Sequence, residues 1–162
     1  MFKGAVVTVS DKGFRGERED KSGEIIKNML KQIDVNVAFY RIVPDEKEMI
    51  KQTLIDFAER GIDLVVTTGG TGLAPRDVTP DATLEVIDRE VPGMAEAMRI
   101  KGIENTLHAM LSRAVVGVRK RTLIINLPGS PKGARENLEA VIDAIPHGLK
   151  VLKGEVEECG KD

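Results

Sequence analysis

Hydrophobic residues follow two alternating patterns along the chain. Short runs rich in β-branched residues, each ending at a polar, Gly or Pro residue, predict strands at residues 4–10, 35–43, 63–69 and 122–128. A fifth run, at 114–120, would pair with residues 122–128 across a tight turn.

Amphipathic helices are predicted between these runs. In residues 24–33 the apolar side chains recur at helical spacing and place Ile26, Met29 and Leu30 on one stripe. The same spacing recurs in three later segments: 48–58, 82–88 and 137–145. Strands that alternate with helices of this length favour parallel pairing through right-handed crossovers. We therefore expect an α/β fold: a three-layer, mostly parallel sheet with helices on both faces, one antiparallel hairpin at an edge, and residues 1–162 forming one domain.

Polar residues gather where the predicted strands end. The first strand ends at Ser10 and Asp11, Asp45 follows the second, residues 69–72 follow the third, and residues 129–132 follow the last. Open α/β sheets bind ligands outside the carboxyl ends of their parallel strands. If the pairing is parallel, all these endings share one edge of the sheet, and the sequence predicts a binding site there.

The third strand is followed by four residues that suit an anion: Gly69, Gly70, Thr71 and Gly72. Adjacent glycines let backbone N–H groups turn toward a ligand without an obstructing Cβ. A following helix adds orphan N–H donors and a favourable dipole, and Thr79 and Pro80 are its expected N-cap and first residue. The pattern is neither a P-loop nor a dinucleotide fingerprint. A plain tight turn explains these four residues equally well.

Four aspartates near the strand ends have both a chemical and a structural interpretation. Asp77 is a candidate Mg²⁺ ligand or electrostatic anchor, because hard cations bind carboxylate oxygens; a surface loop acid is the alternative. Asp45 is spaced from Glu48 as in a capping box, so it can cap a helix instead. Asp11 suits a loop after a strand, and Asp81 suits a first helical turn, where an acid complements the dipole. The shared location of these acids, rather than any one of them, favours a site.

The last strand is followed by residues that resemble a second helix start: Gly129, Ser130, Pro131 and Lys132. Ser130 is the expected N-cap and Pro131 the first helical residue. Lys132 is then either a phosphate ligand or a solvated surface lysine.

Composition excludes several classes of protein. With 41% hydrophobic residues and a net charge of −2, the chain has a globular composition and lacks the positive surface of a general nucleic-acid or membrane binder. One cysteine, Cys159, cannot build a disulfide framework, and two distant histidines, His108 and His147, argue against zinc chemistry. We expect both histidines to be structural. There is no signal-peptide pattern and no apolar run of ~20 residues, so we expect a cytoplasmic location.

Two anion-binding helix starts beside carboxylates are typical of phosphoryl or nucleotidyl transfer. In such reactions the protein mainly positions the reacting groups and neutralises charge, while a carboxylate-bound Mg²⁺ polarises the phosphorus under attack. The sequence therefore predicts a phosphate and metal site, without naming the nucleophile.

Four motifs together resemble one known family. IVPDE at 42–46, TTGGTG at 67–72, RDVTPDAT at 76–83 and NLPGSPKG at 126–133 closely resemble the MogA/MoaB family of molybdenum cofactor biosynthesis. The resemblance runs over almost the whole chain. It implies a molybdopterin-binding α/β fold, a homotrimer, and molybdopterin adenylyltransferase activity with Mg²⁺. In that reaction molybdopterin attacks the α-phosphate of ATP, and the adenylylated product passes to a molybdate-insertion protein.

The resemblance also implies roles for particular residues. The family's two critical aspartates match Asp45 and Asp77. For Asp45, the resemblance therefore favours a functional role over helix capping. Its pterin-phosphate loop matches residues 69–72, and further pocket segments match Ser10 with Asp11 and residues 129–132.

Other functions fit the same motifs. The compact segment AVIDAIPHGLKVL before the end of the chain is as in MoaB-type members, whereas TPDAT and PGSPKG are closer to the MogA branch. A carrier that holds molybdopterin without adenylylating it is the main alternative. A nucleotide-sensing regulatory module is the third.

Overall fold

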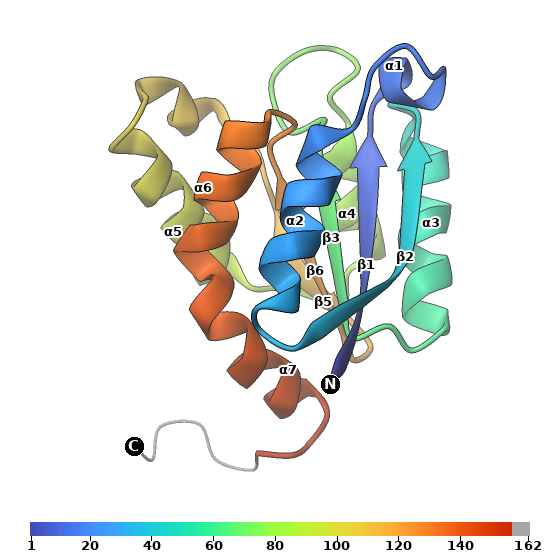
Figure 1. Cartoon of the computed structure of the whole chain (residues 1–162), viewed down its shortest axis with the longest axis vertical. Coiled ribbons are helices and arrows are strands. Elements are labelled where there is room, and N and C mark those ends of the chain that lie inside the picture. Colours follow the sequence, from blue (N-terminus) through green and yellow to red (C-terminus); the bar gives the residue numbers. More distant parts are fainter. Residues whose placement is uncertain (157–162) are drawn as a thin grey trace.

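A six-stranded sheet with the order β2-β1-β3-β6-β5-β4 forms the middle layer of the computed structural model, which describes residues 1–156 (Figure 1). The strands are β1 (Phe2–Val9), β2 (Val35–Val43), β3 (Leu64–Thr68), β4 (Arg89–Glu90), β5 (Val116–Arg119) and β6 (Thr122–Leu127). β1, β2, β3 and β6 are parallel to one another. Toward one edge of the sheet, β5 pairs antiparallel with β6 in a hairpin and also pairs antiparallel with the edge strand β4. The predicted mostly parallel sheet and its edge hairpin are confirmed. The two-residue β4 has no apolar pattern and was not predicted.

Helices cover both faces of this sheet. The α-helices are α1 (Asp11–Phe14), α2 (Lys21–Lys31), α3 (Lys47–Glu59), α4 (Thr79–Val86), α5 (Pro92–Ile103), α6 (Pro131–Val141) and α7 (Ile145–Leu152), with 3₁₀ turns η1 (Leu107–Leu111) and η2 (Ile142–Ala144). One face carries α2, α5, α6 and α7, and the other carries α3 and α4. The predicted start of α4 was one residue too late: Thr79 was expected to be the N-cap, but Val78 is the N-cap and Thr79 is already helical.

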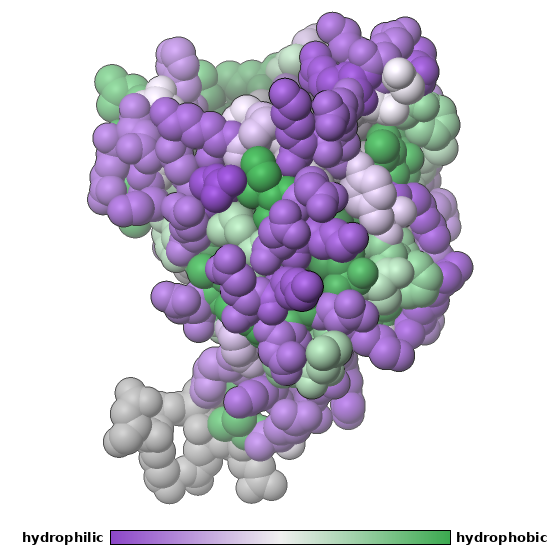
Figure 2. Space-filling model, in the orientation of Figure 1, coloured by the Kyte–Doolittle hydropathy of each residue, from purple (hydrophilic) through white to green (hydrophobic). Residues whose placement is uncertain are grey.

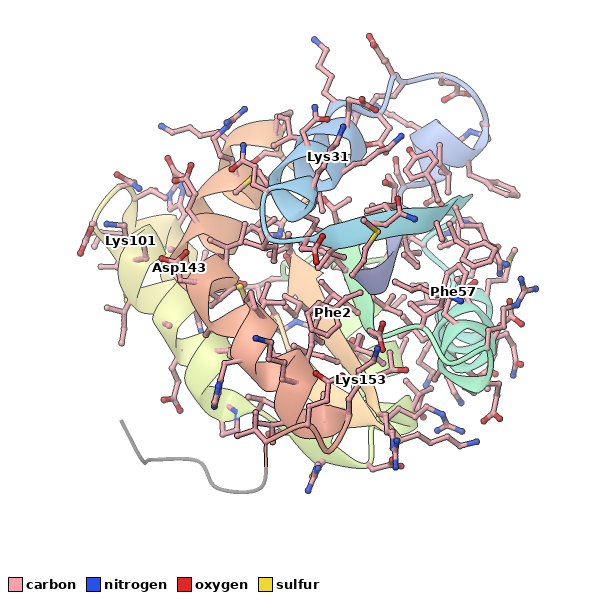
Figure 3. The ribbon with its side chains drawn as sticks, turned by 60° about the horizontal axis from the view of Figure 1, so that its bottom comes forward. Phe2, Lys31, Phe57, Lys101, Asp143 and Lys153 are labelled. Atoms are coloured by element: carbon pink, nitrogen blue, oxygen red, sulfur yellow. The ribbon has the colours of Figure 1, made fainter. Side chains whose placement is uncertain are left out.

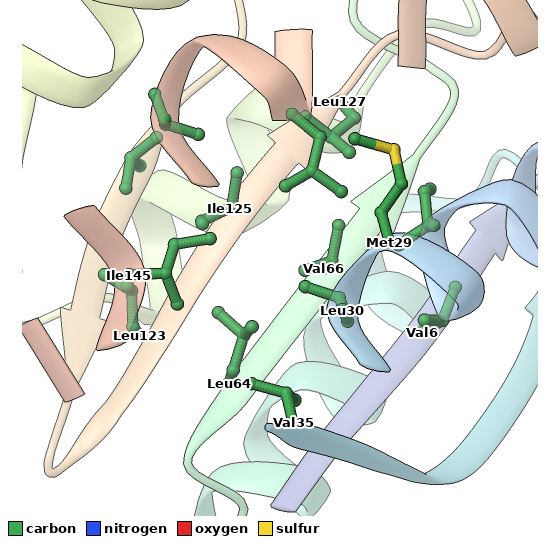
Figure 4. Close-up of a cluster of buried hydrophobic side chains, with 14 of the residues drawn as sticks. Val6, Met29, Leu30, Val35, Leu64, Val66, Leu123, Ile125, Leu127 and Ile145 are labelled. Carbon is green, nitrogen blue, oxygen red and sulfur yellow. The ribbon is translucent and has the colours of Figure 1, made fainter. Parts of the chain in front are cut away.

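Alternation along the strands divides the core between the two faces. Val6, Val66 and Ile125 pack toward α2 and α6 in the cluster drawn in Figure 4. The neighbouring residues Val65 and Ile124 point the other way and pack against α3 and α4. Successive side chains of a strand face opposite sides, so strands buried on both faces are almost wholly apolar. This explains the short continuous apolar runs in the sequence.

The register of the parallel strands brings their carboxyl ends level. Thr8 of β1 lies opposite Thr68 of β3, which lies opposite Leu127 of β6. The segments after these strands therefore emerge side by side, together with the first turns of α2 and α6, at the top of Figure 1. At the opposite end, Lys153 lies 5.3 Å from the ring centroid of Phe2, near the start of β1 (Figure 3).

Candidate active site at the carboxyl ends of the strands

A cavity of about 910 Å³ lies where these strand ends meet. Its lining comes from the ends of β1 and β3, the segments that follow β1, β2, β3 and β6, the segment before α2 and the first residues of α2 and α6. We call it the strand-end pocket; its lining comprises Thr8, Val9, Ser10, Gly13, Arg18, Glu19, Asp20, Lys21, Ser22, Asp45, Thr68, Gly69, Gly70, Thr71, Gly72, Asp77, Gly129, Ser130 and Pro131. A cavity of this size can hold a ligand of nucleotide or pterin dimensions.

Most of the candidate site residues predicted from the sequence line this pocket. They are Ser10, Asp45, Gly69, Gly70, Thr71, Gly72, Asp77, Gly129, Ser130 and Pro131. Asp11 and Lys132 do not line it. Asp11 borders a smaller neighbouring hollow with Arg76, and the Lys132 side chain is 81% exposed, with its Nζ 3.9 Å from Glu136.

The glycine-rich loop after β3 adopts a backbone that only glycine tolerates easily. Gly69 and Gly70 have φ values of 103° and 70°, in the region that disfavours side chains. A Cβ on Gly69 would clash with the carbonyl oxygen of Val9, and a Cβ on Gly129 would lie 3.2 Å from Gly69 Cα. The turns after β1, β3 and β6 are thus packed backbone to backbone, which holds the floor of the pocket together.

Asp11 and Asp45 join the ends of β1 and β2. The backbone N–H of Asp11 donates to Asp45 Oδ2 at 2.9 Å, and the N–H of Asp45 donates to Asp11 Oδ1 at 3.0 Å. The capping interpretation of Asp45 is wrong, since the N-cap of α3 is Glu46 and no side chain caps that helix. One oxygen of the Asp45 carboxylate accepts the N–H of Asp11 instead.

The two carboxylates differ in their electrostatic surroundings. Arg76 donates to both oxygens of Asp11, at 2.7 and 2.9 Å, and this hydrogen bonding lowers the pKa of Asp11 to about 2. Burial raises the pKa of Asp45, and the nearby charges of Asp11 and Asp77 raise it further. Neighbouring acids with pKa values pushed apart are common where carboxylates have separate roles.

Asp77 reaches the same pocket from the end of the loop. Its Oδ2 accepts the N–H of Ala74 at 3.0 Å, and a Cβ on Gly72 would lie 2.9 Å from that oxygen. Asp81, interpreted from sequence as a complement to the helix dipole, also forms an ion pair with Arg113 at 3.2 Å.

Two helices begin beside the pocket. Ser130 is the N-cap of α6, as predicted, and its hydroxyl accepts the N–H of Gly133 at 3.0 Å. Asp20 caps α2 by accepting the N–H of Gly23 at 3.0 Å. The hydroxyl of Ser22, in the first turn of α2, donates to the carbonyl of Gly129 at 2.8 Å. The two helix starts are therefore tied to each other across the pocket wall.

The segment before α2 was missed by sequence analysis. Asp20 accepts hydrogen bonds from Thr8 Oγ1, at 2.6 Å, and from the Tyr40 hydroxyl; burial and this bond raise the pKa of Tyr40 to about 12. Arg18 and Lys21 line the pocket beside it. The helical period of α2 was recognised only from Glu24 onward, and the polar residues before it carry no pattern that ties them to a pocket.

The donor atoms present fit a magnesium ion that also binds phosphate. Asp45 and Asp77 each have one oxygen that accepts no hydrogen bond from residues 1–156. Magnesium is commonly held by one or two carboxylates together with waters and substrate phosphates. No group of three or more His, Cys, Asp or Glu side chains within residues 1–156 forms a preassembled metal site. The two carboxylates, each with one oxygen available, match the protein ligands that magnesium takes when it binds together with phosphate.

Neither His108, on η1, nor His147, on α7, lines the pocket, and Cys159 lies outside the described residues. Within residues 1–156 no helix is both long and apolar enough to cross a bilayer.

Comparison with known proteins identifies the chain's relatives. Residues 5–147 match the family model described as a probable molybdopterin binding domain. The molybdopterin adenylyltransferase of Helicobacter pylori is 45% identical over 152 residues, which is 92% of this chain and 86% of that protein. That of Escherichia coli K12 is 44% identical, over 97% of this chain and 88% of its own length.

Solved structures agree with this assignment. The molybdopterin biosynthesis enzyme MoaB from Thermus thermophilus superposes with a TM-score of 0.90 at 58% identity, covering 95% of this chain and 98% of that one. A structure of MogA superposes with a TM-score of 0.89 at 38% identity, covering 93% and 99%. The sheet, its edge hairpin and the helices on both faces are those of these proteins. The chain therefore belongs to the molybdopterin-binding domain family, among the MogA and MoaB proteins of molybdenum cofactor biosynthesis.

Proposed function

We propose that the protein is a molybdopterin adenylyltransferase, which transfers AMP from Mg-ATP to the terminal phosphate of molybdopterin. The observation that carries this proposal is the convergence of Asp45 and Asp77, from separate loops, on the pocket that the glycine-rich loop also lines. The names of relatives that are about 45% identical support the same reaction.

The reaction requires two phosphate groups to be held together. A terminal phosphate oxygen of molybdopterin attacks the α-phosphorus of ATP; a new P–O bond forms, and the bond to the β-phosphate breaks to release pyrophosphate. The backbone N–H groups of Gly70 to Gly72 and the first turns of α2 and α6 are suited to bind phosphate oxygens. Their role is to align the attacking and leaving oxygens and to exclude water from the reacting phosphorus.

Asp45 and Asp77 are the residues that would hold magnesium. When bound, the ion neutralises phosphate charge and polarises the α-phosphorus. Asp45 must be ionised for this role; burial and the neighbouring carboxylates raise its pKa, and a bound cation would offset this by favouring the ionised form.

Cations in the pocket would balance the remaining phosphate charge. Arg18 and Lys21 are the positively charged residues of the lining. By contrast, Arg76 is paired with Asp11 and Arg113 with Asp81. We assign the phosphate role that the sequence suggested for Lys132 to Arg18 and Lys21 instead.

A carrier that binds molybdopterin without turnover is the second candidate. The sequence leaves this candidate open, because the compact segment AVIDAIPHGLKVL resembles that of MoaB-type members. The retention of both aspartates in the pocket favours catalysis.

An assay of pyrophosphate release separates the candidates. The protein is incubated with molybdopterin and Mg-ATP, and both pyrophosphate and adenylylated pterin are measured. An adenylyltransferase forms both products in equal amounts. Binding of molybdopterin without either product selects the carrier, and binding of ATP without affinity for the pterin selects a nucleotide sensor.

The family resemblance also supports a proposal for the oligomeric state, the location and the partner of the protein. We infer a homotrimer in the cytoplasm that passes adenylylated molybdopterin to a molybdate-insertion protein. Exposed apolar side chains support self-association; they cluster on α5 and η1 and comprise Ile100, Ile103, Leu107, Met110 and Leu111. Apolar surface is visible over this region at the upper left of Figure 2. Sedimentation equilibrium tests the trimer.

A further inference from the structure

The side chain of Arg113 binds the loop of residues 69–78, which begins with the glycine-rich segment, at two separate points. Arg113 lies between η1 and β5, far along the chain from the loop. Its Nε donates to the carbonyl of Gly72 at 2.9 Å, and its Nη2 donates to the carbonyl of Asp77 at 2.5 Å. Its own backbone N–H donates to the carbonyl of Thr71 at 2.9 Å. One residue thus spans the loop from Thr71 to Asp77.

The guanidinium also holds the start of the helix that follows. Nη1 and Nη2 lie 3.2 Å from the carboxylate of Asp81, in the first turn of α4. The planar fork therefore joins the loop to a fixed element. Within residues 1–156, no other side chain from outside the loop donates to a carbonyl oxygen of residues 69–78.

The bonds inside the loop do not fix it to the rest of the molecule. Ala74 and Asp77 bond to each other, through Asp77 N–H to the Ala74 carbonyl and Ala74 N–H to the Asp77 carboxylate. The loop is otherwise tied by backbone bonds near its two ends, where the N–H of Gly69 donates to the carbonyl of Leu127 and the N–H of Thr79 donates to the carbonyl of Gly70. Glycine-rich backbone has large conformational freedom, and ordering it carries an entropic cost. An external anchor on the main chain of Asp77 restricts that movement where the carboxylate must be placed.

We propose that Arg113 is a positioning residue, which fixes the Asp77 carboxylate in the strand-end pocket by clamping the loop from outside. It does not line the pocket, so it acts through Asp77 rather than on the substrate. The consequence for catalysis rests on the proposed adenylyl transfer, whereas the clamp itself does not.

Lysine cannot reproduce the clamp. An ammonium group is a compact donor, while the guanidinium presents separate donors in a rigid plane. Arg113→Lys keeps the charge beside Asp81 but loses the simultaneous bonds to Gly72 and Asp77. Arg119 supplies a matched control, because its Nη1 also donates to a backbone carbonyl, that of Val86 at 2.7 Å, and this residue belongs neither to the loop nor to the segment around Arg113.

The test compares Arg113→Lys, Arg119→Lys and Asp81→Asn in three measurements: steady-state kinetics, thermal unfolding and backbone hydrogen exchange. Arg113→Lys should lower kcat at least about tenfold with little change in KM for molybdopterin, since small misplacement of a reacting group is costly. Peptides covering residues 70–77 should exchange faster. Arg119→Lys should leave kcat and this exchange unchanged at a similar unfolding temperature, and Asp81→Asn should have a smaller effect than Arg113→Lys.

Two outcomes overturn the proposal. One is unchanged exchange in residues 70–77 of a folded Arg113→Lys protein. The other is an Asp81→Asn variant that reproduces the whole loss, which would assign the effect to the ion pair. Arg113→Gln replaces the lysine variant should that protein not fold. If the wild-type protein lacks transferase activity, the proposed function fails, and the exchange comparison still decides the clamp.

Discussion

Asp11 and Asp45 each accept the backbone N–H of the other, at 3.0 and 2.9 Å, so that the ends of β1 and β2 are joined by a reciprocal pair of hydrogen bonds. The pair is not symmetrical in charge. Arg76 holds the pKa of Asp11 near 2, while burial raises the pKa of Asp45. Asp11 thus has a structural partner on its outer side, and Asp45 faces the pocket with an oxygen left for a ligand.

Replacing either pocket aspartate with asparagine should remove activity without unfolding the protein. Asn can still accept the N–H of Asp11 at position 45, or of Ala74 at position 77, so the local hydrogen bonds survive. Loss of the negative charge should lower the rate of adenylyl transfer by about 100-fold or more, as when transition-state electrostatics is removed. Asp143→Asn, at an exposed acid on η2, is the control (Figure 3). A near-normal rate in Asp45→Asn or Asp77→Asn would remove that residue from the mechanism.

Alanine substitutions at two glycines with positive φ should distinguish the cost of backbone strain from the cost of a steric clash. Gly16 has a φ of 75°, and a Cβ added there would have nothing within 4 Å, so Gly16→Ala should cost only about 1–2 kcal/mol in unfolding free energy. Gly69→Ala adds a clash with the Val9 carbonyl oxygen, and should cost about 3 kcal/mol or more. Urea unfolding measures both. Equal costs would contradict the close packing of the turns after β1 and β3.

Substitutions of Lys21 and Lys132 should affect nucleotide binding differently. Lys21 lines the pocket, whereas Lys132 lies outside it and is 81% exposed. Lys21→Gln should therefore raise KM for ATP by about tenfold, the loss expected for one phosphate contact of about 1.4 kcal/mol. Lys132→Gln should change it by less than about twofold. Titration with Mg-bound α,β-methylene ATP checks the same order without turnover. The reverse order would restore the phosphate role that the sequence suggested for Lys132.

Removing Arg76 should reduce stability in a way that depends on pH. The pKa of Asp11 in the folded protein is below its ordinary value of 3.8, so the pair stabilises the fold fully above that pH and loses its effect as pH falls toward about 2. Arg76→Gln should lower the unfolding free energy near pH 6 only slightly, as for exposed ion pairs. Urea unfolding between pH 6 and pH 2 should show the two proteins converging. A difference that stays constant to pH 2 would exclude Asp11 as the titrating partner.

Much of this site could be predicted from the strand ends alone. Apolar runs bounded by polar turns indicated the parallel strands, and parallel pairing requires their ends to meet. That reasoning placed Asp45, Asp77 and the glycine-rich loop together. Ser130 was also identified correctly, because an N-cap depends on local sequence.

The remaining features depend on contacts between distant residues. Asp45 has the spacing of a capping box, but the N–H of Asp11 takes its carboxylate in the fold. Lys132 lies beside the correct cap, yet the direction of its side chain is set by how α6 rotates against the sheet. Arg18 and Lys21 reach the pocket because Asp20 is held by Thr8 and Tyr40. No local pattern encodes that network.

A crystal structure with molybdopterin, Mn²⁺ and α,β-methylene ATP tests the central claim most directly. The methylene bridge blocks transfer, and the anomalous signal of manganese locates the metal. The account predicts a manganese peak within bonding distance of Asp45 or Asp77, with the α-phosphate over residues 69–72 and the pterin phosphate in the same pocket. Nucleotide and metal bound away from the carboxyl ends of β1, β3 and β6 would contradict it.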